Sequence, residues 1–125
     1  MFGPDSVEIG PSQRQLGAIA ADKGDFALAE RLYHQSLETE RRHRGPRHPK
    51  TVGVLNDLGT IYIAKSEFEK ALATYQEITS ILRETLGNAH PELASNLENL
   101  ANVLYRMKRY PEATAQLEEV LAIRK

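Results

Sequence analysis

Apolar residues recur along the chain at intervals of three and four positions, which is the spacing of an amphipathic helix. Short polar turns separate six such segments, and none of them alternates with the period of two that marks a strand. The pattern predicts helices at about residues 12–23, 26–43, 49–65, 67–86, 91–107 and 110–125. The predicted fold class is therefore all-α.

The helical pattern itself repeats every 42 residues. A shift by this period superimposes Leu16-Gly17, Leu58-Gly59 and Leu100-Ala101, then Ala29, Ala71 and Ala113, and the connections Gly45-Pro46-Arg47-His48-Pro49 and Gly87-Asn88-Ala89-His90-Pro91. These matches predict one domain, residues 1–125, made of three repeats at about 7–48, 49–90 and 91–125. The first residues align with a connection between repeats, so we expect a piece of a longer array.

Glycine and proline mark where the predicted helices end and begin. Gly45 and Gly87 stand where a left-handed residue closes a helix, a conformation that glycine adopts without steric cost. Pro49 and Pro91 stand at a first helical position, where a missing N–H does no harm. Within the hairpins, Asp25 and Ser66 are candidate N-caps.

The residues that recur are those a helical hairpin needs for its own packing. Gly59 and Ala71 are small enough to let two helices approach, and larger side chains fill the space around them. One hairpin cannot bury both of its faces, so successive hairpins are expected to stack. Two positions depart from the pattern: Gln13 and Thr79 stand where other copies carry leucine, and they predict local weak spots.

The motif Leu55-x2-Leu58-Gly59-x2-Tyr62, followed by Ala71-x3-Tyr75, resembles the tetratricopeptide repeat over essentially the whole chain. The period of 42, against about 34 in the common unit, and the Gly-x-x-His-Pro connection are similar to the kinesin light chain type. The resemblance implies an α-solenoid of three tandem hairpins that forms part of a right-handed superhelix. It also implies a concave face, lined by the first helix of each hairpin, that holds an extended or helical peptide segment.

Carried over residue by residue, the resemblance predicts eight peptide-binding side chains. They are Arg14, Asn56, Thr60, Ile63, Glu98, Asn102, Tyr105 and Arg106. Asparagine suits this role because its amide offers both a donor and an acceptor to a peptide backbone. The alternative is a solvated helix face with no ligand. The family's clamp for a partner's terminal carboxylates needs lysine and asparagine where this chain has Arg14 and Ala18, which disfavours that form of recognition.

Composition narrows the partners further. With 16 basic and 17 acidic residues the net charge is −1, which gives no general attraction to nucleic acid or to an anionic membrane. Cysteine is absent, so there is no disulfide framework, thiolate metal site or cysteine nucleophile. No apolar run approaches a membrane span, and the start of the sequence lacks the features of a secretory signal. We therefore expect a cytoplasmic protein whose partner is another protein or a peptide.

No motif of catalysis, phosphate binding or metal binding stands out, so we expect neither a cofactor nor an enzyme. His48 and His90 recur with the connection, which favours a structural role at a helix start over a metal ligand. The basic run 41–50 complements the end of a helix dipole, with an acidic partner or a phosphate as the alternative. Paired acidic residues, Glu38 with Glu40 and Glu118 with Glu119, are interpreted as solvated helix surface.

The sequence thus predicts a non-catalytic scaffold for protein–protein interaction. One alternative is a self-associating or structural spacer, because the stripe of Leu117, Val120, Leu121 and Ile123 on the last predicted helix has no following helix to cover it. That stripe would also allow a homo-oligomer. Another alternative is a regulatory docking module of a larger enzyme or signalling protein.

Overall fold

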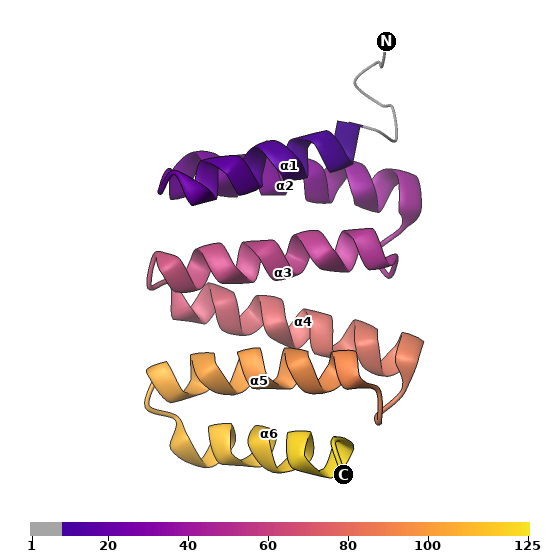
Figure 1. Cartoon of the computed structure of the whole chain (residues 1–125), viewed down its shortest axis with the longest axis vertical. Coiled ribbons are helices and arrows are strands. Elements are labelled where there is room, and N and C mark those ends of the chain that lie inside the picture. The colour runs from indigo at the N-terminus through magenta and orange to yellow at the C-terminus, as the bar shows by residue number, and fades with distance from the viewer. Residues whose placement is uncertain (1–8) are drawn as a thin grey trace. The chain divides into compact units, whose positions relative to one another are not determined.

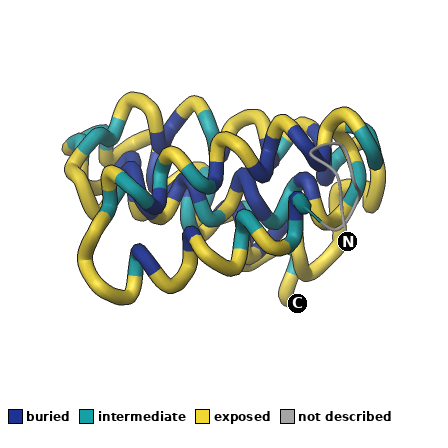
Figure 2. Tube along the Cα trace, turned by 90° about the horizontal axis from the view of Figure 1, so that it is seen from above, coloured by how far each residue is buried: buried dark blue, intermediate teal, exposed yellow. Residues whose placement is uncertain are grey.

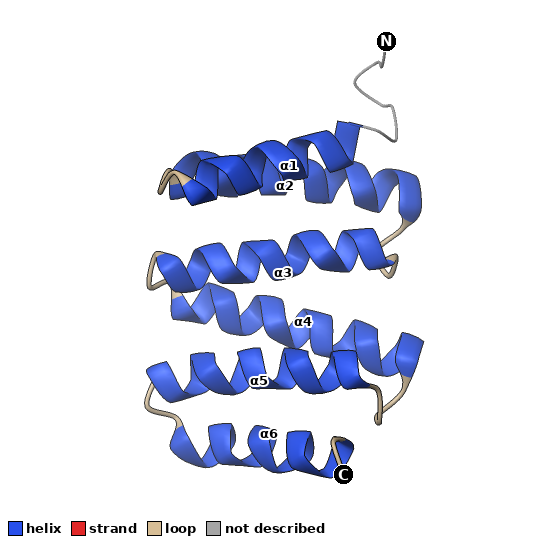
Figure 3. Ribbon diagram, in the orientation of Figure 1, coloured by secondary structure: helices blue, strands red, loops and turns tan. Residues whose placement is uncertain are grey.

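The computed structural model describes residues 9–125, which form helices joined by short connections (Figure 1). The helices are α1 (Ile9–Asp22), α2 (Phe26–Arg44), α3 (Pro49–Ala64), α4 (Phe68–Leu86), α5 (Pro91–Arg106) and α6 (Tyr110–Ile123). Figure 3 shows no strand in this described part, and the all-α prediction is confirmed. Helix ends agree with the predicted ones within three residues, the largest difference being that α1 already includes Ile9. Pro11 is tolerated there because N–H groups of a first turn have no helical partner.

The chain divides into two compact units, Met1–Lys65 and Ser66–Lys125. In the described part of the first unit, α2 packs against both α1 and α3. In the second unit, α5 packs against both α4 and α6. The middle repeat of the sequence is divided between the units, with α3 in one and α4 in the other. The single domain of three repeats therefore stays a prediction.

Each helix buries one side, so dark and light segments alternate along the chain in Figure 2. Small residues lie where helices approach most closely, as the sequence predicts. A Cβ on Gly17 would lie 2.7 Å from the ring of Tyr33, which packs α2 against α1. In the second unit Ala101 and Ala113, at the matching repeat positions of α5 and α6, are buried.

The turns within the hairpins share one backbone conformation. Asp25 caps α2 as predicted, because its Oδ1 accepts a hydrogen bond of 3.1 Å from the Leu28 N–H. The prediction that Ser66 caps α4 is wrong. Ser66 has a φ of 60°, and Lys108 in the last hairpin has 63°, both at the repeat position of Gly24. This turn requires a positive φ, which costs a residue with a side chain about 1–2 kcal/mol.

The connections between repeats combine a glycine with a histidine cap. Gly45 and Gly87 have φ values of 91° and 86°, so the predicted positive φ is confirmed. Their ψ values, 162° and −179°, are extended rather than those of a left-handed helix. That combination is essentially restricted to glycine.

The two recurring histidines begin helices, as predicted. The Nδ1 atoms of His48 and His90 accept hydrogen bonds of 3.1 Å from the N–H groups of Lys50 and Glu92, in the first turns of α3 and α5. Each histidine thus takes the capping role that serine or aspartate usually fills. The structural interpretation of these histidines is confirmed.

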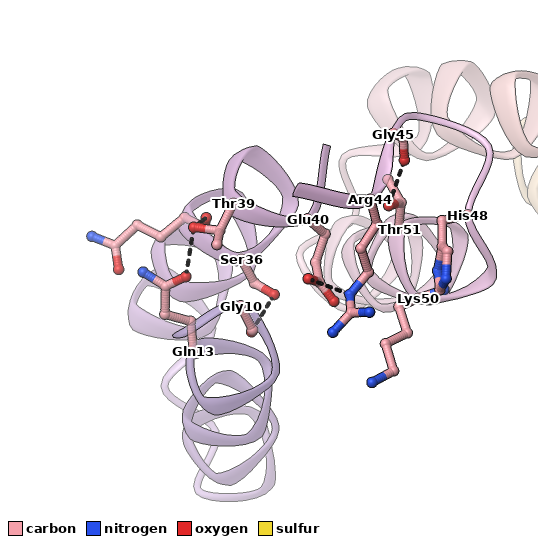
Figure 4. Close-up of polar contacts among 11 residues, drawn as sticks. Gly10, Gln13, Ser36, Thr39, Glu40, Arg44, Gly45, His48, Lys50 and Thr51 are labelled. Carbon is pink, nitrogen blue, oxygen red and sulfur yellow. Dashed lines mark hydrogen bonds and ion pairs between the residues drawn. The ribbon is translucent and has the colours of Figure 1, made fainter. Parts of the chain in front are cut away.

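Polar side chains join α1 to α2 in the first unit (Figure 4). The Ser36 hydroxyl, fully buried, donates a 2.7 Å hydrogen bond to the Gly10 carbonyl. The Thr39 hydroxyl lies 3.1 Å from the Gln13 side-chain oxygen and donates to it. The predicted weak spot at Gln13 is therefore a polar contact rather than an unfilled space.

Glu40 continues this polar interface and corrects an interpretation made from the sequence. It was expected on the solvated surface, but only 1% of the residue is exposed. The Arg44 Nε donates a 3.1 Å hydrogen bond to its Oε1. Gly10 makes the burial possible, since a Cβ there would lie 2.7 Å from the same oxygen.

In the second unit a polar pair joins α4 to α5. The amide of Asn96, a buried residue, donates 2.7 Å and 3.3 Å hydrogen bonds to the Thr79 hydroxyl and the Tyr75 carbonyl. Thr79 in turn donates to the same carbonyl at 2.8 Å. The polar residue at position 79 thus has a polar partner across the interface. The Asn96 Oδ1 is buried and accepts no hydrogen bond from the residues that the structure describes.

Candidate functional site

The three helices of the first unit surround a pocket of about 460 Å³. One wall comes from α1, the opposite wall from α3, and α2 contributes two further side chains. The lining residues are Pro11, Arg14, Gln15 and Ala18 of α1, Tyr33 and Glu40 of α2, and Lys50 and Asp57 of α3. The pocket is therefore lined mainly by the first helices of two successive repeats.

An ion pair links the two walls. The Arg14 Nε lies 2.7 Å from Asp57 Oδ2, and both side chains are only partly exposed. Gly53 provides the space for this arginine, because a Cβ there would lie 2.8 Å from a guanidinium nitrogen. A side chain at position 53 would therefore displace Arg14. The ion pair thus joins α1 to α3 across the site.

Tyr33 and Glu40 bring polar atoms from α2 into the pocket. Burial raises the pKa of the Tyr33 phenol, and the Asp57 carboxylate raises it further against the opposing effect of Arg14. The phenol therefore stays neutral at physiological pH and can serve as donor or acceptor.

Two basic residues, Arg14 and Lys50, and two acidic residues, Glu40 and Asp57, line the pocket. Arg14 is balanced by Asp57, and Glu40 by Arg44. Lys50 makes no ion pair with any residue in 9–125, and no dashed line reaches its amine in Figure 4. The start of α3 that carries Lys50 is held in place by Thr51, whose buried hydroxyl donates 2.8 Å to the Gly45 carbonyl. Lys50 is therefore a cation of the pocket without an ion-pair partner among residues 9–125, at a well-held position.

Of the predicted peptide-binding residues in the first unit, Arg14 alone lines this pocket. Asn56, Thr60 and Ile63 follow each other along one face of α3, the first two exposed and the third half-buried. The Thr60 hydroxyl donates 3.1 Å to the Asn56 carbonyl of its own helix. These three residues thus form a surface strip, outside the pocket.

The predicted residues of the second unit, Glu98, Asn102, Tyr105 and Arg106, are all exposed on α5. Arg124, the residue that follows α6, donates a 2.8 Å hydrogen bond to Glu98, and this hydrogen bond lowers the pKa of the Glu98 carboxyl group. The Arg106 Nε is 3.4 Å from Asn102 Oδ1. Tyr105 lies nearly edge-on to Tyr110, with ring centroids 5.5 Å apart.

Sequence reasoning missed most of the pocket. Asp57 lies one position after Asn56 of the α3 strip and Lys50 lies six positions before it, so neither was expected to share a site with Arg14. Arg14 and Asp57 carry opposite charges and are separated by one period plus one residue, and this spacing could have indicated an ion pair between neighbouring repeats. Glu40 was assigned to the solvated surface, and that assignment does not indicate a pocket.

Residues 9–125 contain no cluster of histidine, cysteine, aspartate or glutamate that could hold a metal ion. Within the same residues, no helix is long and apolar enough to cross a membrane.

Comparison with known families now settles what kind of chain this is. The model of the tetratricopeptide repeat matches residues 8–84 and again residues 53–125. The chain belongs to the tetratricopeptide repeat family. Domains of this family are generally protein-interaction modules and are typically non-catalytic.

Several solved structures share the fold. BtubC (BKLC) from P. vanneervenii has a TM-score of 0.89 at 24% identity, over 97% of this chain and 48% of that one. A Podosopora anserina protein described as a kinesin light chain with nearly identical TPR-like repeats has a TM-score of 0.79 at 24% identity, over 98% of this chain and 57% of that one. The N-terminal domain of stress-induced protein-1 (STI-1) from C. elegans has a TM-score of 0.76 at 16% identity, over 94% and 85%.

The chain thus spans about half the length of the two kinesin light chain-like structures. No curated protein matches its sequence.

Proposed function

We propose that this tetratricopeptide repeat chain is a non-catalytic scaffold that holds a peptide segment of a partner protein. The segment lies against the first helices of the repeats, with α1 and α3 as its main contact in the first unit. The exposed face of α5, with Asn102, Tyr105 and Arg106, is the contact surface of the second unit.

The pocket of the first unit is the observation that carries this proposal. The Arg14–Asp57 ion pair joins its two walls and holds both side chains toward each other, so a ligand meets side chains that are already in place. The amine of Lys50 has no partner among the described residues and favours a segment that carries a carboxylate. The neutral Tyr33 phenol and the Gln15 amide offer hydrogen bonds to the peptide backbone.

The test begins with selection of a random peptide library on the immobilised chain. Binding of enriched peptides is then measured by fluorescence anisotropy. We expect Lys50→Glu to weaken binding at least tenfold, because it replaces the unpaired cation with a repelling charge. Arg31→Glu is the matched control, since Arg31 is exposed on α2 outside the pocket and the charge change is the same.

A second variant tests the surface of the second unit. Asn102→Glu places a bulky acid on the exposed face of α5, and thermal unfolding should change little because the side chain is solvated. Peptides that bind the Lys50→Glu and Asn102→Glu variants as tightly as the wild type would contradict the proposed contact surface.

A further inference from the structure

Gly53 stands in the interior of α3, where glycine destabilises a helix relative to alanine. The space that its missing side chain leaves is filled by Arg14 of α1. A Cβ at position 53 would lie 2.8 Å, 2.9 Å and 3.0 Å from Nη1, Nη2 and Cζ of that arginine. The flat end of the Arg14 side chain therefore lies against the backbone of α3. Gly53 thus provides a seat for a side chain that comes from a different helix.

Asp57 holds the guanidinium on this seat. It follows Gly53 by four positions, so the two residues lie on the same face of α3. Its Oδ2 accepts a 2.7 Å hydrogen bond from the Arg14 Nε, which uses one of the five N–H donors of the guanidinium. The four N–H groups on Nη1 and Nη2 make no hydrogen bond with any other residue in 9–125. Because Arg14 lines the pocket, these four donors are available to a ligand that lies there.

The repeat does not need this arrangement in order to fold. One period later, the positions of the arginine, the glycine and the aspartate hold Asn56, Ser95 and Asn99. Ser95 lies in α5, which has the same length as α3 and the same histidine cap. The first helix of a repeat therefore forms with a side chain at the Gly53 position. The glycine in α3 is explained by the arginine that it receives.

We propose that Arg14 selects an acidic side chain of the peptide segment whose binding is proposed above, with Gly53 and Asp57 as its positioning residues. The paired N–H groups of a guanidinium match the two oxygens of a carboxylate, so this contact has a defined geometry as well as a charge. Lys50 brings a charge to the same pocket, but its ammonium has no planar fork. The segment therefore carries an aspartate or a glutamate where it meets Arg14.

A double-mutant cycle between protein and peptide tests the contact. An enriched peptide is compared with a version in which the acidic residue is replaced by its amide, Glu by Gln or Asp by Asn. On the wild type this change should weaken binding about tenfold or more, because a hydrogen bond to a charged group is lost. On Arg14→Gln the same change should have little effect, because the guanidinium is already absent. An equal effect on both proteins would show that the carboxylate binds elsewhere and would overturn the proposal.

Arg14→Lys separates the fork from the charge. It keeps the positive charge but cannot form two parallel hydrogen bonds with one carboxylate. We expect it to bind the acidic peptide far more weakly than the wild type. Binding at the strength of the wild type would show that charge alone is recognised, and would overturn the selection by geometry.

Gly53→Ala tests the seat without changing any charge. The added methyl group displaces the guanidinium, so binding of the acidic peptide should weaken about as much as in Arg14→Gln. The melting temperature should stay close to that of the wild type, because the helix propensity of alanine offsets the loss of a partly exposed ion pair. A glycine needed only for packing would instead lose stability and binding together. Ser95→Ala is the matched control at the same repeat position of α5, and it should change neither quantity.

Exchange of the two charged residues separates recognition from the link between the helices. The double variant Arg14→Asp with Asp57→Arg restores an ion pair between α1 and α3, so its thermal unfolding should resemble that of the wild type. Binding of the acidic peptide should remain as weak as in Arg14→Gln, because the guanidinium no longer lies on the Gly53 seat. Recovery of the wild-type affinity would show that the ion pair only joins the two helices, and would overturn the role of Arg14.

The source of the carboxylate is tested at the terminus of the peptide. Peptides with an amidated C-terminus should bind as tightly as those with a free one, because the acid that meets Arg14 is a side chain. Loss of binding on amidation would overturn that assignment. Peptides that bind the wild type and Arg14→Gln equally would leave peptide binding in place and remove Arg14 from it, whereas a failure to enrich any peptide would reject the proposed function as well.

Discussion

The hairpin of α1 and α2 and the hairpin of α5 and α6 occupy matching places in the repeat, but their interfaces differ in chemistry. The first uses Gln13, Ser36 and Thr39, and the last has Leu97, Val120 and Ile123 at the same positions. Hydrogen bonds therefore stabilise one interface where apolar burial stabilises the other. A net hydrogen bond contributes about 1 kcal/mol, whereas burying a leucine contributes about 1.5–3 kcal/mol.

The chemical difference between the two interfaces lies close to the pocket. The polar hairpin is the one whose Glu40 reaches the pocket, at the position where α4 has Leu82. Packing at this end of the first unit is therefore weaker per residue, and a carboxylate is present at the proposed binding site. The first hairpin thus has polar side chains close to where Glu40 reaches the pocket, whereas the last hairpin has apolar side chains at the same repeat positions.

The largest expected effect tests the comparison at one repeat position. Leu97→Ala should lower the free energy of unfolding by about 2–5 kcal/mol, because Leu97 is fully buried. Gln13→Ala removes a half-buried polar contact and should cost about 1 kcal/mol. Urea unfolding measures the free energy of unfolding of both variants. Amide hydrogen exchange then shows whether the loss of stability lies in α5 or in α1. Equal losses in the free energy of unfolding would show that hydrogen bonds and apolar burial stabilise the two interfaces to the same extent.

Glu40 comes next. Glu40→Ala should destabilise by about 3 kcal/mol, since it breaks a buried pair and leaves a cavity. Glu40→Leu places in α2 the residue type that α4 has at Leu82. Its melting temperature should be at least as high as that of the wild type, because a hydrophobic residue replaces a desolvated charge. Thermal unfolding distinguishes the two variants. If Glu40→Leu is as unstable as Glu40→Ala, the carboxylate is essential to the hairpin rather than a feature of the pocket.

A smaller effect is expected at the junction of α4 and α5. Thr79 and Asn96 stand where α2 and α3 have Leu37 and Val54. Thr79→Leu alone should cost about 1–3 kcal/mol, because it leaves the Asn96 amide with a poorer set of partners. Adding Asn96→Val should recover that loss, since the double variant reproduces the apolar pair. A double-mutant cycle in urea measures the coupling free energy between positions 79 and 96. Additive changes in the free energy of unfolding would contradict the proposed coupling.

The smallest effect is a pH dependence in the second unit. Arg83 donates two hydrogen bonds, of 2.7 Å and 2.9 Å, to Glu119, which lowers the pKa of the glutamate. The stabilisation is therefore present above the ordinary pKa of glutamate and is lost as the pH falls through the lowered value. For a partly exposed pair it amounts to about 0.2–1 kcal/mol. The difference in melting temperature between the wild type and Glu119→Gln should shrink towards zero in acid.

The fold was largely predictable because its signals are local. Helical spacing, the glycine and proline positions and the period of 42 residues are properties of neighbouring residues, and the predicted helices are confirmed. Ser66 was misassigned because its backbone conformation depends on the shape of the turn rather than on its capping propensity. The pairing of Thr79 with Asn96 could not be seen from either position alone.

The pocket depends instead on contacts between helices. Arg14 was predicted from the family pattern, whereas Asp57 and Lys50 belong to the site because the fold brings them beside the pocket residues of α1. Glu40 was placed on the surface because a glutamate near a helix end is usually solvated. The absence of a side chain on Gly10, thirty positions earlier, reverses that expectation. Such compensation depends on which residues lie close together in the folded chain, and the sequence pattern alone does not show this.

The connections at Gly45 and Gly87 have a consequence for how such a chain can change in length. Each combines a glycine-only backbone conformation with a histidine cap on the next helix, so the joint is complete within a few residues. A duplication or deletion whose endpoints fall at the two glycines would insert or remove one whole repeat and recreate an intact joint. Lineages can therefore gain or lose copies by recombination without inventing a new loop.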